Sequence, residues 1–161
     1  MNVRGWSSWL VAASLAVSST PLVAAGGRPV DIPERARGAS AVVVARTTEV
    51  TPVWQTNEFG DLLIVSQVQL EVEETLKGTP PGNLWLSVDG GTLNGLTLRV
   101  SGLPTMAVGE RAVFFVDDAP NGSHKPHLKG LGILKLDSTD TVQGSRLLLR
   151  DIRSMVRGAG R

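Results

Sequence analysis

The chain has 161 residues, with 16 lysines and arginines, 15 aspartates and glutamates, and no cysteine. The absence of cysteine excludes disulfide bonds and a lipid anchor attached to an amino-terminal cysteine. The near-neutral charge argues against nucleic-acid binding, because that class of protein needs a basic surface that neutralises phosphates.

The first 25 residues have the pattern of a signal peptide. Arg4 is followed by an apolar stretch at 6–17, and the small residues 23–25 match the site that a signal peptidase reads. An uncleaved membrane anchor is the alternative, but it needs about 20 apolar residues. The sequence therefore predicts a cleaved signal peptide at 1–25, export to the periplasm or outside the cell, and no membrane span after cleavage. About 135 residues remain, enough for one domain.

Three segments open the mature chain. Residues 26–40 form a polar leader with one expected helical turn. Residues 41–50 are rich in β-branched side chains and predict a strand, and the turn formers within 51–61 predict a hairpin connection. The apolar residues expected to share one face of that strand are Val42, Val44 and Val50.

The second strand has the clearest period-two alternation in the chain, which is typical of a half-buried antiparallel strand. Its apolar face holds Ile64, Val68, Leu70 and Val72, and its polar face holds Gln67, Gln69, Glu71 and Glu73. Glu71, Glu73, Glu74 and Lys77 raise the alternative of a catalytic cluster. Like-charged neighbours on one strand face favour water, and the Gly-Thr-Pro-Pro-Gly turn at 78–82 follows. We interpret the stretch as the end of a strand.

Further short strands follow at even spacing, with no long helical pattern before the tail. They are expected at 84–88, at 96–100 inside a glycine-rich hairpin, at 112–116, and at 127–136 with a bend at Gly130 and Gly132. This spacing predicts a mainly β fold, a small five- to six-stranded antiparallel OB-like barrel over 41–137 with a short C-terminal helix.

The tail at 138–161 contains a predicted amphipathic helix at about 147–157. One arc holds Leu148, Leu149, Ile152, Met155 and Val156, and the other holds Arg146, Arg150, Arg153 and Arg157. Either the helix docks on the barrel with its arginines in water, or Arg150, Arg153 and Arg157 bind an anionic surface such as membrane lipid, polysaccharide or an acidic partner.

The order AVVVARTTEV, VQLEVEETLKG, PG, LWLSVDGG and RVSGLPTMAVGERAVFFVDD resembles a group of uncharacterised exported bacterial proteins. More distantly, it is similar to the OB-fold barrel of the netrin-like and tissue-inhibitor-of-metalloproteinases superfamily. The resemblance implies the barrel. It does not imply protease inhibition, because those inhibitors act through an amino-terminal cysteine that this chain lacks.

One group of side chains has the chemistry to bind a metal. His124 and His127, with Asp117 and Asp118 nearby, are ligand types that suit zinc or copper, although Pro126 between the histidines tends to splay the two rings. The bland alternative is a polar loop tip. No nucleophile motif accompanies them, so no catalytic residue is predicted.

Trp54 and Trp85 are candidates for a shared binding patch, with ordinary barrel packing as the alternative. The leading hypothesis is an exported, non-catalytic binding or accessory module for a protein partner, with no cofactor. The alternatives are a metal-binding or metal-dependent protein that uses His124 and His127, and envelope binding through the arginine face of the tail.

Overall fold

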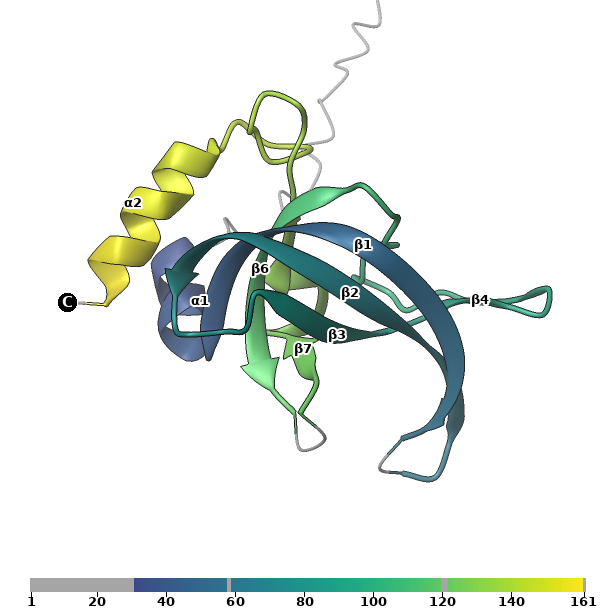
Figure 1. The fold of residues 1–161 in the computed structure, drawn as a ribbon. Coiled ribbons are helices and arrows are strands. Elements are labelled where there is room, and N and C mark those ends of the chain that lie inside the picture. The colour runs from purple at the N-terminus through teal and green to yellow at the C-terminus, as the bar shows by residue number, and fades with distance from the viewer. Residues whose placement is uncertain (1–30, 58, 120–121, 161) are drawn as a thin grey trace, which may run out of the picture.

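Two long antiparallel strands dominate the described chain and coil around a small sheet (Figure 1). The computed structural model describes residues 31–57, 59–119 and 122–160, so the predicted signal peptide and residues 26–30 lie outside it. The strands of the main sheet are β1 (Ala41–Thr56), β2 (Leu62–Lys77), β3 (Asn83–Asp89), β6 (Arg111–Asp118), β7 (His124–Pro126) and β8 (Ile133–Lys135).

The sheet closes into a ring. Its order is β1-β2-β3-β7-β6-β8, and β1 also pairs with β6. All pairs are antiparallel except β3 with β7, which run parallel where Leu86 meets His124. The predicted mainly β, barrel-like fold with a short C-terminal helix is confirmed, with this one parallel pair as a correction. The arrangement fits an OB-fold barrel.

Two helices cover one end of the barrel. Helices α1 (Ile32–Gly38) and α2 (Leu149–Ala159) contact each other, and Figure 1 shows both at one end of the sheet, with the β1–β2 turn at the other. Asp31 caps α1 by accepting a 2.9 Å bond from the Glu34 amide. The tail helix begins and ends two residues later than predicted, and Leu149, Ile152 and Val156 are buried as expected. In the described chain, no helix is long and apolar enough to cross a membrane.

The start of β1 separates two cores. Val43 and Ala45 point into the barrel, whereas Val42 and Val44 pack under the helices, so all of residues 41–45 are buried. A strand covered on both faces has a continuous run of apolar residues, which explains the sequence AVVVA. Phe114 and Phe115 divide in the same way, one to each core.

A β-bulge near Thr48 overturns one prediction. Thr47 pairs with Leu70 and Glu49 pairs with Gln69, so Thr48 is an extra residue in β1. After this extra residue, the side chains of β1 that face the barrel interior alternate differently. As a result, Val50 packs against the core inside the barrel. The expectation that Val42, Val44 and Val50 share one face is therefore wrong.

The connection between β1 and β2 is shorter than predicted. The strand continues past Pro52, which is tolerated because β6 leaves β1 after Arg46 and exposes an edge. The turn spans only 57–61, where the Asn57 side chain accepts bonds from the amides of Phe59 (2.9 Å) and Asp61 (2.8 Å).

The last predicted strand, 127–136, is broken into β7, a 3-10 turn η1 (Lys129–Gly132), and β8. The predicted bend at the two glycines is confirmed, because a Cβ at Gly130 would collide with the carbonyl oxygen of Gly102 and one at Gly132 with that of His127. The glycine-rich segment forms the expected hairpin, β4 (Gly91–Leu93) and β5 (Leu96–Leu98), through Asn94 and Gly95 at positive φ.

Candidate functional site

OB-fold barrels bind ligands on the face of their second and third strands and on the loops that border it. In this chain the corresponding surface consists of β2, β3, the β1–β2 turn and the approach to β7. Two features meet there, a groove at the hairpin end and a polar face of the sheet.

The groove lies between the end of the β1–β2 hairpin and the segment after β7. It encloses about 440 Å³, in the size range of ligand sites. We call it the hairpin-end groove. It is lined by Gln55, Thr56, Asn57, Phe59, Leu63, Val65, Ser87, Asp89, Leu103, Lys125, Pro126 and Lys129.

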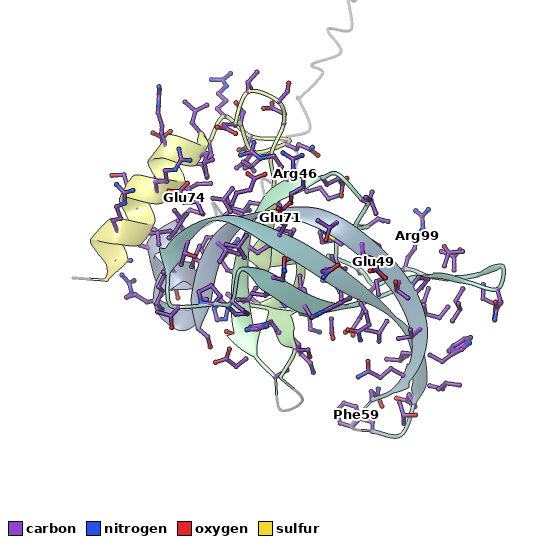
Figure 2. All side chains as sticks on the ribbon, in the orientation of Figure 1. Arg46, Glu49, Phe59, Glu71, Glu74 and Arg99 are labelled. Atoms are coloured by element: carbon purple, nitrogen blue, oxygen red, sulfur yellow. The ribbon has the colours of Figure 1, made fainter. Side chains whose placement is uncertain are left out.

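Large apolar side chains are exposed beside this groove. Phe59 is 81% exposed at the turn, where Figure 2 shows it at the extremity of the hairpin, and Leu62 is 62% exposed. Solitary exposed apolar residues are common on protein surfaces, but a group of them at one projecting end indicates a contact surface.

The opposite wall of the groove is basic. In the part of the chain that the structure describes, neither Lys125 nor Lys129 has an ion-pair or hydrogen-bond partner for its ammonium group, whereas Lys77 and Lys135 both do. Leu128 and Lys129 are both left-handed, with φ of 53° and 57°. Non-glycine residues adopt this region at a cost, and such strain is concentrated at functional sites.

A second cavity of about 450 Å³ lies at the barrel mouth under the β4–β5 hairpin. Val50, Pro52, Val88 and Met106 contribute its apolar surface. Ser66, which also lines it, is buried and donates a 2.7 Å bond to the carbonyl of Gly90, so its hydroxyl is engaged in the fold.

The polar face is formed by side chains that the register places in rows across three strands. One row is Glu49, Gln69 and Trp85, the next is Thr51, Gln67 and Ser87, and Glu71 and Asn83 lie opposite each other beyond them. The amide of Gln67 has a partner within this face, because Ser87 Oγ donates to Gln67 Oε1 at 3.1 Å. We call these rows the β2–β3 platform.

The two candidate tryptophans do not form a shared patch. Trp54 lies opposite Ile64, and Trp85 lies opposite Gln69. These β2 partners are five residues apart with no bulge between them, so the rings lie on opposite faces of the sheet. Whether either ring binds a partner stays a prediction.

The four candidate metal ligands form two separate pairs. His127 Nδ1 lies 2.9 Å from an oxygen of Asp117, and His124 Nε2 lies 3.4 Å from Asp118. Across residues 31–57, 59–119 and 122–160, no group of three or more His, Cys, Asp or Glu side chains is placed to hold a metal ion. The metal hypothesis thus lacks the converging ligands that it requires.

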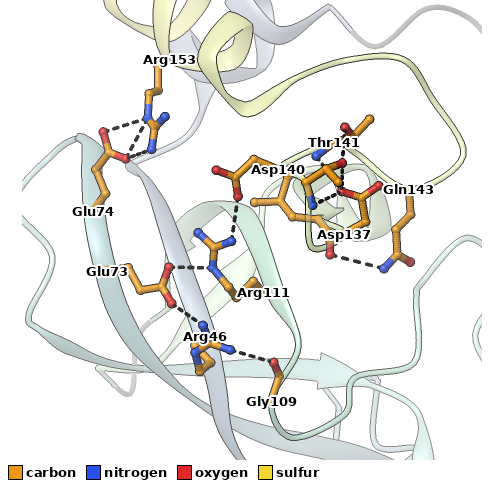
Figure 3. Close-up of polar contacts among 12 residues, drawn as sticks. Arg46, Glu73, Glu74, Gly109, Arg111, Asp137, Asp140, Thr141, Gln143 and Arg153 are labelled. Carbon is orange, nitrogen blue, oxygen red and sulfur yellow. Dashed lines mark hydrogen bonds and ion pairs between the residues drawn. The ribbon is translucent and has the colours of Figure 1, made fainter.

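The predicted arginine face is only partly available. Arg150 is exposed and so is Arg157, but Arg153 forms a two-pronged contact with Glu74, with its Nη2 2.7 Å from Glu74 Oε2 (Figure 3). The hydrogen bonds that Arg153 donates to Glu74 raise the pKa of Arg153 above its ordinary value. Arg153 therefore links α2 to the barrel through this ion pair.

Glu73 and Lys77 are also structural. Glu73 binds both Arg46 (3.1 Å) and Arg111 (2.8 Å), and Arg111 in turn binds Asp140, as Figure 3 shows. The bonds to Asp140 and then Glu73 raise the pKa of Arg111. Lys77 Nζ donates to the carbonyls of Ala36 (2.7 Å) and Ala39 (2.6 Å) at the end of α1. The interpretation of this stretch as the end of a strand agrees with these contacts, but Glu73, Glu74 and Lys77 are paired rather than simply solvated, and Glu71 is exposed.

Arg35 is a residue that no sequence pattern singled out. It is buried, its guanidinium lies 5.5 Å from the centre of the Phe115 ring, and it donates to the carbonyl of Leu131. Burial lowers the pKa of Arg35, with Asp31 opposing the shift. It connects α1 to the segment that forms one wall of the groove.

No protein-family model matches this sequence, and no curated protein matches it significantly. The resemblance to exported bacterial proteins and to the netrin-like superfamily therefore stays a prediction.

Proposed function

We propose that this protein is an exported, non-catalytic binding module that docks on a protein partner through the end of its β1–β2 hairpin. The observation that carries the proposal is the exposed Phe59 at the turn, next to a groove with one apolar side and one basic side. An exposed aromatic beside a pocket is the kind of residue that contributes most to protein–protein affinity.

The chemistry of the groove specifies the partner's contact segment. Leu63, Val65 and Leu103 favour apolar side chains, and the unpaired Lys125 and Lys129 favour a carboxylate. We therefore expect the docked segment to carry apolar residues next to an aspartate, a glutamate or a chain terminus.

Site-directed photocrosslinking in the producing cell tests this proposal. A benzophenone amino acid replaces Phe59 in one strain and Leu96 in another. Leu96 is a matched control, because it is 58% exposed beside the turn of the other hairpin, β4–β5. We expect one dominant protein adduct from position 59 and none from position 96.

The charge requirement is checked in the same strain. Replacing Lys125 and Lys129 together by glutamate should reduce the position-59 adduct about tenfold, because the basic wall of the groove then becomes acidic and repels a carboxylate. Absence of an adduct at position 59, or equal adducts at both positions, would contradict the proposal.

The two alternatives from the sequence have weaker geometric support. Envelope binding retains Arg150 and Arg157 but not Arg153, which is bound to Glu74. Metal binding by His124 and His127 would require both His–Asp pairs to open and converge.

A further inference from the structure

The β2–β3 platform has a chemistry different from that of the hairpin-end groove. Trp85 is 41% exposed there, although it sits within a strand whose neighbours Leu84 and Leu86 are fully buried. Gln69 lies directly across from it on β2, and Glu49 lies across from Gln69 on β1. An indole ring thus lies in one row with an amide and a carboxylate.

This combination suits a sugar ring. One face of a pyranose presents C–H groups, which pack against the electron-rich face of an aromatic ring. Its hydroxyls lie around the edge, where an amide can both donate and accept hydrogen bonds and a carboxylate can accept them. Gln67 and Ser87 supply a second polar row beside the first.

The charge of the platform selects against anionic ligands. Glu49 and Glu71 are both exposed, and Figure 2 labels them along the β1–β2 sheet. Arg46 lies opposite Glu71, but its guanidinium is bound to Glu73 at 3.1 Å. A polyphosphate or a polyuronate would meet two carboxylates here, whereas a neutral glycan would not be repelled.

The dimensions of the platform favour an extended glycan. Neighbouring strands lie about 4.8 Å apart, which is close to the length of one β-1,4-linked pyranose unit. A chain of such units that crosses β3, β2 and β1 would place successive rings over Trp85, Gln69 and Glu49.

We propose that the β2–β3 platform binds a neutral β-1,4-linked hexopyranose chain, with Trp85 as the stacking residue and Gln69 and Glu49 as hydrogen-bonding residues. This site goes beyond the proposed protein contact, because none of these three residues lines the hairpin-end groove.

Calorimetric titration of the exported protein with cellohexaose and with chitohexaose tests the proposal. We expect saturable binding of at least one, and the comparison of the two arms shows whether N-acetyl groups contribute. Trp85→Ala should weaken binding about tenfold, in line with the loss of one aromatic contact. Trp54→Ala is the matched control, because Trp54 is 43% exposed but lies on the other face, and its affinity should be unchanged.

Three results would overturn the proposal: no binding of either hexasaccharide, unchanged affinity in Trp85→Ala, or equal losses in the two tryptophan variants. Polygalacturonate that binds as tightly as the neutral probes would also contradict it. If Trp85→Ala does not fold, Gln69→Ala replaces it and should weaken binding about threefold. Photocrosslinking at position 59 should persist in Trp85→Ala, so failure of one proposal is distinguishable from failure of the other.

Discussion

The first half of β1 is buried, and its second half is largely exposed. Residues 41–45 are buried on both faces, between the barrel core and the two helices. Residues 49–56 have β2 as their strand neighbour and are largely exposed, and they end at a turn that presents Phe59. One continuous strand thus passes from a fully buried segment to a largely exposed one.

We infer from this difference that the covered end of β1 contributes to stability and the open end contributes to binding. At the covered end, apolar burial and paired charges leave few groups free to contact a ligand. At the open end, apolar rings and unpaired lysines contribute little to folding, since removing them exposes no core. If this division holds, substitutions at the covered end should change stability alone, and those at the open end should change binding alone.

The largest expected effect comes from comparing two phenylalanines. Phe115→Ala should reduce the free energy of unfolding by about 3–5 kcal/mol. The ring is fully buried in the core between the barrel and the two helices, and the Arg35 guanidinium lies over it. Phe59→Ala should change it by less than about 0.5 kcal/mol. Urea unfolding followed by circular dichroism measures both. Similar losses in the two variants would show that the hairpin end belongs to the folding core.

Two lysines give the next comparison. Lys77→Met removes the ammonium that binds the last carbonyls of α1, so we expect a loss of about 1–3 kcal/mol in the free energy of unfolding. Lys125→Met, at the open end, should leave stability within about 0.5 kcal/mol of the parent protein. Hydrogen exchange of the α1 amides provides the local readout, and it should quicken only in Lys77→Met.

The sequence predicted the covered end well because its signals are local. Strand alternation in 62–74, the valine run of β1 and the apolar arc of α2 all depend on neighbouring residues. The bulge near Thr48 was missed because it follows from pairing with both β2 and the Gly109–Glu110 turn, which lie far away in the sequence. The break in the last strand likewise depends on the close approach of Gly130 to Gly102.

The candidate sites were harder to predict for the same reason. Trp85 was recognised as alternating with buried leucines, but the face shared with Gln69 and Glu49 needs the register of three strands. The pairing of Trp54 with Trp85 was wrong because sequence alone could not relate their faces. Arg153 and Glu74, 79 residues apart, carried no shared signal, and neither did the two lysines that face Phe59 across a groove.

The smallest expected effect tests the charges at the covered end. Glu74→Gln removes the carboxylate that binds Arg153, and the pair is about one-third exposed, so we expect a loss of only about 0.5–1 kcal/mol. Glu71→Gln is the matched control on the same strand, because no ion pair holds Glu71 within the described residues, and it should leave stability unchanged. Raising the salt concentration to about 1 M shortens the screening length to roughly 3 Å and should remove most of the Glu74 effect. A loss that persists at high salt would mean that Glu74 acts through packing or hydrogen bonding to α2 rather than through charge.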